Sequence, residues 1–408
     1  MNIRNTIKVL IAYLVILLPA VLTLVIFLNI GLNVLRINRG VDFSNIRSQV
    51  ESYLRSERRD ASAKLIGDKL SLRYEYTYPR SQYDYFEKTV NFDPDKEDKI
   101  IYVYGSSPAV SKPPFIGDRF SVFSELLEEK LNSSVSKDSF KVYNMAMTSA
   151  DSSAMYEIVR ATLCVKKPDL VIYFYEGGMD YEAAYYAAKV KESFYPVTIF
   201  SMNDLLMRTG LSGNKKVVRW SGYVSWFNRC YLQPALMNFL QATNILKIPV
   251  APFTEVNAMI TRDLEKNLAR TAELVTSQNI PIVFVASSDN LEAKPYGVYS
   301  VTQMHFDKAM SATDSLERIS FLKEARDSEI FTGDLGARSE AYDVIRGLAL
   351  KGIDKVYVFD LESDLEEEEY PLGYDSFYDY GHMKPELHRK VADEIYVYLR
   401  SERLTPGR

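Results

Sequence analysis

The sequence predicts an α/β protein with a mainly parallel, five-stranded sheet, preceded by one N-terminal transmembrane helix. Two observations lead to this prediction. Five short apolar runs, rich in β-branched and aromatic residues, alternate with segments of helical periodicity, a pattern typical of a parallel sheet with helices on both faces. A long uncharged run stands near the N-terminus. The 408 residues suffice for one large domain or two smaller ones.

The strands and helices of the sheet domain are predicted from these apolar patterns. The predicted strands are Lys99–Tyr104, Lys141–Asn144, Leu170–Tyr175, Ile280–Ala286 and Lys355–Asp360. The predicted helices are Arg119–Leu131, Ser152–Cys164, Asn257–Gln278, Leu316–Asp327, Arg338–Leu350 and Pro385–Arg400. In such sheets ligands bind at the carboxyl ends of the strands. The residues that follow each strand are therefore the candidates for a site.

The N-terminal apolar segment Val9–Leu35 contains no charged residue. As a helix it would be about 40 Å long at roughly 1.5 Å per residue, enough to cross a bilayer with some tilt. The apolar part of a signal peptide is shorter, roughly 7–15 residues, so we expect an uncleaved anchor. Basic residues stand on both sides of the segment, which leaves the positive-inside rule ambivalent. The short tail of residues 1–8 favours a cytoplasmic N-terminus.

The rest of the chain divides into a connecting part and a large domain. Residues 36–97 are expected to form a juxtamembrane stalk, charged and helix-prone from Asn45 to Lys69, and a Tyr-rich packing arm. The large domain is expected at 98–402, with insertions at about 181–254 and 294–336 that are too long for simple loops. The aromatic residues of the first insertion favour packing onto the domain, and a lid or partner surface is the alternative.

Composition excludes several classes of function. The net charge of -5 argues against a nucleic-acid partner. The two cysteines, Cys164 and Cys230, form neither a disulfide framework nor a metal-ligand cluster. Whether they pair with each other stays open.

Three of the predicted strands are followed by segments that suit a ligand site. Gly105-Ser106-Ser107 allows a sharp turn that presents a serine at the sheet edge, although the same residues are common in ordinary turns. The loop from Asn144 to Ser152 can aim a backbone N–H at a developing oxyanion or simply cap a helix. Gly177-Gly178-Met179-Asp180 allows close approach of a ligand, or forms a plain strand-to-helix turn.

The segment Asp379-Tyr380-Gly381-His382 precedes the last predicted helix. His382 is one of three histidines in the chain, with His305 and His388. A carboxylate three residues before a histidine can orient its imidazole as a general base. The position at the carboxyl edge of the sheet strengthens this interpretation.

Taken in order, these four segments resemble the sequence blocks of the SGNH/GDSL hydrolase superfamily. Gly105-Ser106-Ser107 is similar to the Gly-Asp-Ser block, with Ser107 in the nucleophile position. Asn144–Ser152 and Gly177–Asp180 are similar to the two oxyanion blocks, and Asp379-x-x-His382 matches the final one. The resemblance covers roughly residues 99–399. It implies a flavodoxin-like, three-layer α/β/α SGNH-hydrolase fold.

Three positions depart from the family pattern. Ser106 replaces an aspartate that is not the triad acid, and Ser149 replaces an oxyanion glycine whose backbone N–H can survive the change. Met179 stands where the family has its oxyanion asparagine, and methionine cannot donate a hydrogen bond. Losing one such donor typically costs about 2.7–4 kcal/mol of transition-state stabilisation. That is roughly a hundred- to a thousandfold in rate.

The resemblance implies a serine mechanism without a metal or organic cofactor. Ser107 attacks an ester carbonyl, His382 takes its proton, and Asp379 orients the imidazole. The residues implied at or beside the oxyanion, besides the N–H of Ser107, are Ser149, Gly178 and Met179. Water, or a sugar hydroxyl in a transferase, then resolves the acyl-enzyme.

Two functions follow from the resemblance and the anchor. The first is a single-pass membrane protein whose C-terminal domain lies outside the cytoplasm and acts as an esterase, deacetylase or O-acyltransferase. Its substrate would be a cell-surface glycan or another ester, and a membrane-bound O-acyltransferase its partner. The second is a catalytically weak or inactive SGNH-fold protein that binds a glycan or such a partner. Met179 is the main support for the second.

Overall fold

The structure is a computed structural model, and it describes residues 45–55, 61–80, 83–92, 99–110, 120–133, 139–148, 150–188, 251–293, 295, 300–329 and 337–405. The predicted tail and membrane segment, residues 1–8 and Val9–Leu35, lie outside the described residues, as does most of the first predicted insertion. Within the described ranges, no helix combines the length and apolarity needed to cross a bilayer.

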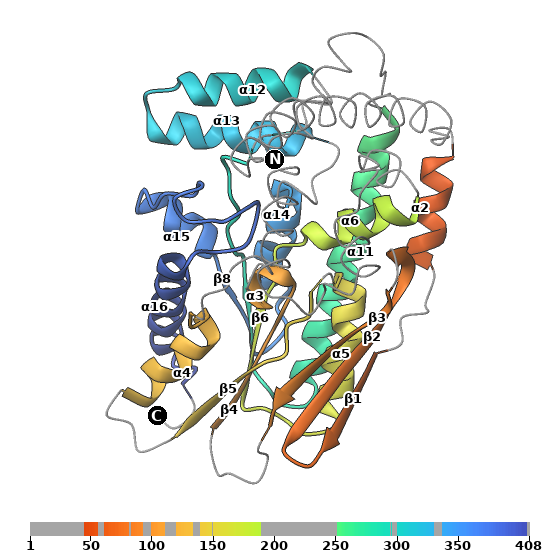
Figure 1. Cartoon of the computed structure of the whole chain (residues 1–408), viewed down its shortest axis with the longest axis vertical. Helices are drawn as coiled ribbons and strands as arrows, with labels where there is room; N and C mark the ends of the chain where they lie inside the picture. The colour runs from red at the N-terminus through yellow and green to blue at the C-terminus, as the bar shows by residue number, and fades with distance from the viewer. Residues whose placement is uncertain are drawn as a thin grey trace, which may run out of the picture.

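A five-stranded parallel sheet forms the centre of the molecule (Figure 1). Its strands are β4 (Lys99–Gly105), β5 (Phe140–Asn144), β6 (Leu170–Phe174), β7 (Ile282–Val285) and β8 (Val356–Phe359). They lie in the order β5-β4-β6-β7-β8, and all four pairings are parallel. Numbered along the chain this is the order 2-1-3-4-5 of flavodoxin-like sheets. The predicted parallel sheet is confirmed.

Helices cover both faces of this sheet, which gives three layers (Figure 1). One face carries α4 (Phe123–Ser133) and α16 (Pro385–Ser401), and the other α5 (Ser152–Leu163), α11 (Ala251–Thr276) and α14 (Ser339–Gly347). Successive side chains of β4 alternate between the two cores. Tyr102 and Tyr104 pack with α5 and α11, whereas Ile101 and Val103 pack with α4 and α16.

Two helices begin at residues that the sequence indicates. Asp151 caps α5, because its carboxylate accepts a hydrogen bond from the backbone N–H of Ala154 at 2.8 Å. Pro385 occupies the first turn of α16, where a missing N–H has no consequence. These caps fix where the chain leaves the sheet edge and enters each helix.

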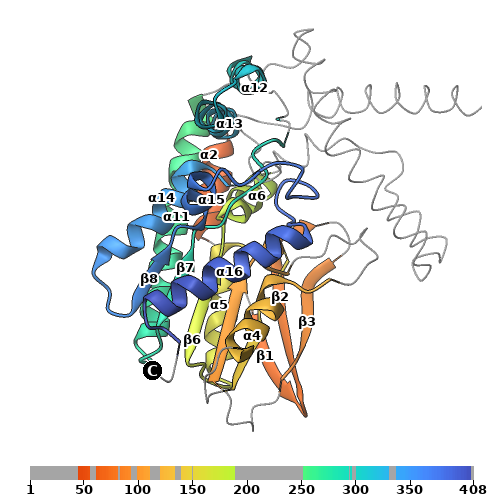
Figure 2. The same cartoon turned by 90° about the vertical axis from the view of Figure 1, so that its left-hand side faces the viewer.

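The N-terminal part of the described chain forms one helix and a second sheet. The elements are α2 (Ile46–Arg55), β1 (Ala61–Ile66), β2 (Lys69–Arg80) and β3 (Tyr83–Asn91). The three strands pair antiparallel in the order β1-β2-β3. This sheet packs against α5, and Figure 1 shows it on the opposite side of the parallel sheet from α4 and α16. Figure 2 shows its three strands side by side.

Helix α2 packs into the core of the main domain, which differs from the predicted stalk. Ile46, Val50 and Tyr53 recur at the spacing of one helix face, are buried, and share a core with α5 and α11. Each fully buried apolar side chain contributes about 1.5–3 kcal/mol. The charged residues that suggested a stalk include Arg47 and Glu51, which lie off this buried face.

The remaining elements lie mostly around the carboxyl ends of the parallel strands. They are α3 (Ser107–Val110), α6 (Gly178–Ala187), α12 (Ser300–Ser311), α13 (Ser315–Ser328), a 3-10 helix (Leu348–Lys351) and α15 (Leu361–Glu367). Helices α12 and α13 form a hairpin in the second predicted insertion. Both views place this hairpin beyond the carboxyl end of the sheet (Figures 1 and 2).

Candidate active site

Ser107 is the first residue of α3, directly after β4, and its side chain is largely buried. Gly105 makes the turn between them feasible. A Cβ atom at position 105 would lie 2.1 Å from the carbonyl oxygen of Phe174 on β6 and 2.8 Å from Cβ of Ala109. Only glycine therefore fits where β4 leaves the sheet.

Asp379 and His382 form a hydrogen-bonded pair ahead of α16. The imidazole Nδ1 lies 2.7 Å from Oδ2 and 2.9 Å from Oδ1 of the carboxylate. The same carboxylate accepts the backbone N–H groups of His382 at 2.8 Å and Gly381 at 3.1 Å. The loop thus closes on itself and sets the orientation of the ring.

The electrostatics of this pair suit a general base. Burial opposes the ionisation of Asp379, but the charge of His382 and the hydrogen bonds from His382 and Gly381 outweigh it, so the pKa of Asp379 is lowered. An ionised carboxylate beside Nδ1 favours the tautomer with the proton on Nδ1. That leaves Nε2 as the basic nitrogen.

The loop that carries His382 lies against the turn that carries Ser107. A Cβ atom built on Gly381 would lie 3.4 Å from Cγ of Pro108 and 3.8 Å from Oδ1 of Asp289. Gly381, the residue before His382, and Pro108, the residue after Ser107, therefore lie near each other. The first and last predicted blocks meet at the carboxyl edge of the sheet.

Asn290 holds the His382 loop in place, although it belongs to none of the four sequence blocks. Its side-chain amide donates to the carbonyl of Asp379 at 2.8 Å, and its backbone N–H donates to the carbonyl of Tyr380 at 2.9 Å. Asn290 is buried. The run Ser287-Ser288-Asp289-Asn290 directly follows β7, so its position at a strand end could have indicated it.

Hydrogen bonding in the loop after β5 limits which N–H groups can face a ligand. Met145 and Met147 donate to the carbonyls of Val103 and Gly105 on β4, at 2.7 and 3.0 Å. Ala146 donates to the side chain of Asn144 at 3.0 Å. Each backbone N–H makes essentially one bond, so these three are already used. The predicted oxyanion residue Ser149 lies outside the described residues.

Lys88 of β3 reaches this same loop from the N-terminal sheet. Its ammonium group donates to the carbonyls of Asn144 and Ala146, both at 2.9 Å, and to Oδ1 of Asn144 at 3.2 Å. None of the ion pairs among the described residues involves Lys88. Burial without a counter-ion lowers the pKa of Lys88 to about 8. The N-terminal sheet therefore contributes directly to the order of the loop.

The third predicted block offers backbone groups but no side-chain donor. Gly177 has φ +85, and a Cβ atom there would lie 2.9 Å from Cβ of Ala341. Met179 packs in the core shared with α5 and α11. Asp180 accepts the backbone N–H of Ser152 at 3.2 Å. The side chains of this block thus stabilise the fold.

Some backbone N–H groups remain for an oxyanion. Among the residues that the structure describes, the N–H groups of Ser107, Gly178 and Met179 have no acceptor. All three are buried at the carboxyl edge of the sheet. Unpaired buried N–H groups are rare in proteins, and a ligand or ordered water commonly satisfies them.

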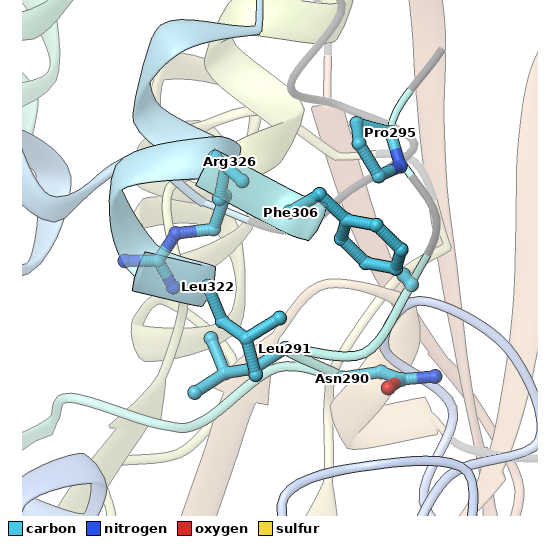
Figure 3. A pocket seen from close by; sticks show the side chains of 8 residues that line it. Asn290, Leu291, Pro295, Phe306, Leu322 and Arg326 are labelled. Atoms are coloured by element: carbon cyan, nitrogen blue, oxygen red, sulfur yellow. The ribbon is translucent and has the colours of Figure 1, made fainter. Parts of the chain in front are cut away.

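A small cavity adjoins Asn290 but is too small for a substrate. Its volume is about 10 Å³, about the space of one water molecule. Figure 3 shows Phe306 and Leu322 of the α12–α13 hairpin facing Asn290 and Leu291 across it. The residues that line it are Asn290, Leu291, Ala293, Pro295, Phe306, Leu322, Ala325 and Arg326.

Among the described residues, no group of three or more His, Cys, Asp or Glu side chains is arranged to hold a metal ion.

Cys164 is free and exposed, and Cys230 lies outside the described residues. His388 is buried in the core, where its Nδ1 accepts the backbone N–H of Phe123 at 3.3 Å. His388 therefore belongs to the core, whereas His382 lies in the loop at the sheet edge.

Comparison with known proteins gives only distant structural likeness. No family model matches the chain, and no curated protein matches it significantly. A lipase/acylhydrolase from Enterococcus faecalis is 13% identical with a TM-score of 0.35, and the match covers 74% of this chain and 96% of that one. An acetyl xylan esterase is 13% identical with a TM-score of 0.38, covering 74% and 99%. Neither likeness identifies an activity for this chain.

Proposed function

We propose that this protein is a serine esterase or O-acyltransferase of the SGNH type, anchored in a membrane and acting outside the cytoplasm. The observation that carries the proposal is the hydrogen-bonded Asp379–His382 pair, whose loop lies near Pro108, the residue after Ser107. A histidine base oriented by a carboxylate and placed near a serine is the arrangement that nucleophilic acyl transfer requires. The long uncharged segment Val9–Leu35 supports the anchor.

The proposed reaction proceeds in two steps. Nε2 of His382 takes the hydroxyl proton of Ser107 while Oγ forms a bond to the ester carbonyl carbon. The tetrahedral intermediate expels the alcohol, which receives that proton, and leaves an acyl group on Ser107. Water then attacks the acyl carbon, and its proton passes through His382 to Oγ of Ser107, which leaves as the free hydroxyl as a carboxylic acid is released. A glycan hydroxyl that attacks in the same way forms a new ester. Asp379 stabilises the imidazolium in both steps.

The oxyanion donors in this proposal are backbone groups. The N–H of Ser107 is the first, since it has no acceptor among the described residues. The N–H groups of Gly178 and Met179, at the start of α6, also have no acceptor among the described residues. In this proposal they replace the missing asparagine side chain as oxyanion donors. Ser149 stays a candidate for a further backbone donor. Preorganised donors of this kind usually supply the largest single contribution to acyl-transfer catalysis.

The test is covalent labelling of the full chain with a fluorophosphonate, followed by peptide mapping. We expect the label on Ser107 in the wild type, no label in Ser107→Ala, and strongly reduced labelling in His382→Gln. Ser311→Ala, which changes an exposed serine on α12, is the matched control and should label like the wild type. Equal labelling of Ser107→Ala and the wild type would contradict the nucleophile assignment.

Methionine at position 179 favours a second candidate function, a non-catalytic protein that binds a glycan or a membrane-bound O-acyltransferase. Its side chain packs in the core and cannot donate to an oxyanion. Absence of labelling in the folded wild type, together with retention of an acetylated glycan on the protein, would favour this function. Hydrolysis of p-nitrophenyl acetate that disappears in Ser107→Ala would exclude it.

The membrane anchor and the choice between hydrolase and transferase need separate measurements. Protease accessibility in sealed vesicles should show residues 45–405 on the side opposite the N-terminus. Adding a glycan acceptor to the acyl-enzyme should shorten its lifetime and transfer the acyl group if the protein is a transferase. If it is a hydrolase, the lifetime is unchanged and only free acid forms. Co-purification would test the proposed acyltransferase partner.

A further inference from the structure

Glu176 is a buried carboxylate bonded to the residue that precedes Ser107. The hydroxyl of Ser106 lies 2.6 Å from Oε1 and 2.9 Å from Oε2 of Glu176. Ser106 is fully buried, and Glu176 is 5% exposed. Within the described part of the chain, Glu176 takes part in no ion pair. Its one direct side-chain partner is therefore the neighbour of the nucleophile.

The pairing of the two central strands brings these residues together. Gly105 of β4 pairs with Phe174 of β6, and the missing Cβ at position 105 lets the strands approach closely. Ser106 then stands one residue beyond β4, and Glu176 two residues beyond β6. The carbonyl of Ser106 also accepts the N–H groups of α3, from Ala109 at 3.1 Å and from Val110 at 3.3 Å. Ser106 is thus held by both its side chain and its carbonyl.

The charged groups that face Glu176 come from two other elements. Burial and, to a smaller extent, the negative charge of Asp289 after β7 raise the pKa of Glu176, whereas the Ser106 hydrogen bond, a hydrogen bond from its own backbone and the positive charge of His382 lower it. The net effect raises the pKa of Glu176 to about 7. Asp289 itself accepts the N–H of Ala337 at 2.7 Å and the hydroxyl of Tyr342 at 2.6 Å. Its charged neighbours are Arg326 and Glu362.

We propose that Glu176 is a positioning residue of the active site, which fixes the Ser106–Ser107 turn through its hydrogen bond to Ser106 and whose carboxylate interacts electrostatically with His382. This inference rests on the proposed function, because it gives Glu176 a role in the chemistry of Ser107. When His382 takes the proton of Ser107 it becomes an imidazolium. Where Glu176 is ionised, its negative charge stabilises that form in addition to Asp379, and the hydrogen bond to Ser106 keeps the nucleophile in one place.

Glu176→Gln and Ser106→Ala separate the two parts of this role. Glutamine keeps the size of the side chain and one acceptor oxygen but removes the ionisable group, whereas Ser106→Ala removes the hydrogen bond and keeps the carboxyl group. Glu128→Gln is the control for loss of a carboxylate outside the predicted site: Glu128 of α4 accepts the backbone N–H of Val142 at 2.8 Å and pairs with Lys141 at 2.7 Å. All three are made in the full chain in detergent.

The measurement is the rate of fluorophosphonate labelling as a function of pH. We expect the acid limb to move to lower pH in Glu176→Gln by about half a pH unit or more, because removing a nearby anion lowers the pKa of the imidazole. Ser106→Ala should label several-fold more slowly, and Glu128→Gln should match the wild type. A Glu176→Gln profile identical to that of the wild type would overturn the proposal.

A second measurement keeps this inference apart from the proposed function. The chain has three histidines, so NMR of histidine-labelled protein can follow His382 directly, with His382→Gln to assign its signal. If the wild type is not labelled at all, the proposed function fails. The His382 pKa in Glu176→Gln then still decides, and an unchanged value overturns the inference. If Glu176→Gln does not fold, the titration of His382 in the wild type decides instead. The ionisation of Glu176 should add a second step to that titration curve, so a curve with a single step would overturn the inference.

Discussion

Replacing Lys88 with methionine removes a partly buried charge that the N-terminal sheet places on the loop after β5. Methionine has a similar length and no donor, so the carbonyls of Asn144 and Ala146 each lose a hydrogen bond of 2.9 Å. Each buried acceptor left without a donor costs about 1–3 kcal/mol. We therefore expect a less ordered loop and slower reaction at Ser107, about tenfold for every ~1.4 kcal/mol of loop stabilisation lost.

The same substitution changes how stability depends on pH. The lowering of the Lys88 pKa from 10.5 to about 8 corresponds to about 3 kcal/mol. Below about pH 8 the amine is charged in both states, and the folded state carries the full cost of burying the charge. Between pH 8 and 10.5 the unfolded chain binds the proton and the folded chain does not, so stability rises with pH. The methionine variant lacks this rise.

Urea unfolding of the wild type and Lys88→Met in the same detergent, at pH 7 and pH 10, measures this contribution. The free energy of unfolding of the wild type should increase relative to the variant by about 2–3 kcal/mol between the two pH values. Lys64→Met, which changes an exposed lysine on β1, should show no such relative increase. If the difference in free energy of unfolding between the wild type and Lys88→Met does not change with pH, the lowered pKa of Lys88 is refuted. If Lys88→Met labels at Ser107 as fast as the wild type, the proposed effect of Lys88 on the loop is refuted.

Three further substitutions test the site. Asp379→Asn should leave the protein folded but lower kcat for ester hydrolysis by roughly 10³–10⁴-fold, because an amide favours the wrong tautomer of His382; a loss below tenfold would contradict this. Asn290→Leu leaves the carbonyl of Asp379 without its side-chain donor, so it should lower the free energy of unfolding by about 1–3 kcal/mol. It should also slow the labelling of Ser107, and labelling at the wild-type rate would contradict the positioning role of Asn290. Gly105→Ala should prevent stable folding, because its Cβ would overlap the Phe174 carbonyl, and a wild-type melting temperature would disprove that.

The parallel sheet was predictable because its strands are short, apolar and rich in β-branched or aromatic residues. All five predicted runs coincide with strands, and Asp151 caps its helix as its position indicates. The Asp379–His382 pair was predictable as well, since a spacing of three residues brings the two side chains together locally. Local patterns of this kind need no knowledge of the tertiary structure.

Contacts between distant segments could not be predicted in the same way. Lys88 and Asn144 are 56 residues apart, and Asn290 and Asp379 are 89 residues apart. Neither pair has a motif, because each depends on how separate elements pack. Helix α2 was predicted as a stalk because its composition is charged, although its apolar residues have the spacing of a buried face. Periodicity is the better guide here than composition.

The packing of α2 and the antiparallel sheet onto the main domain has a practical consequence for producing the protein. A truncated fragment that began at the first parallel strand would lose Val50 and Tyr53 from the core and would expose apolar side chains of α5 and α11 to water. It would also lose Lys88. Such a fragment would be prone to aggregate, and its inactivity would say nothing about Ser107. A secreted or detergent-free version for crystallisation should therefore begin at or before Asn45.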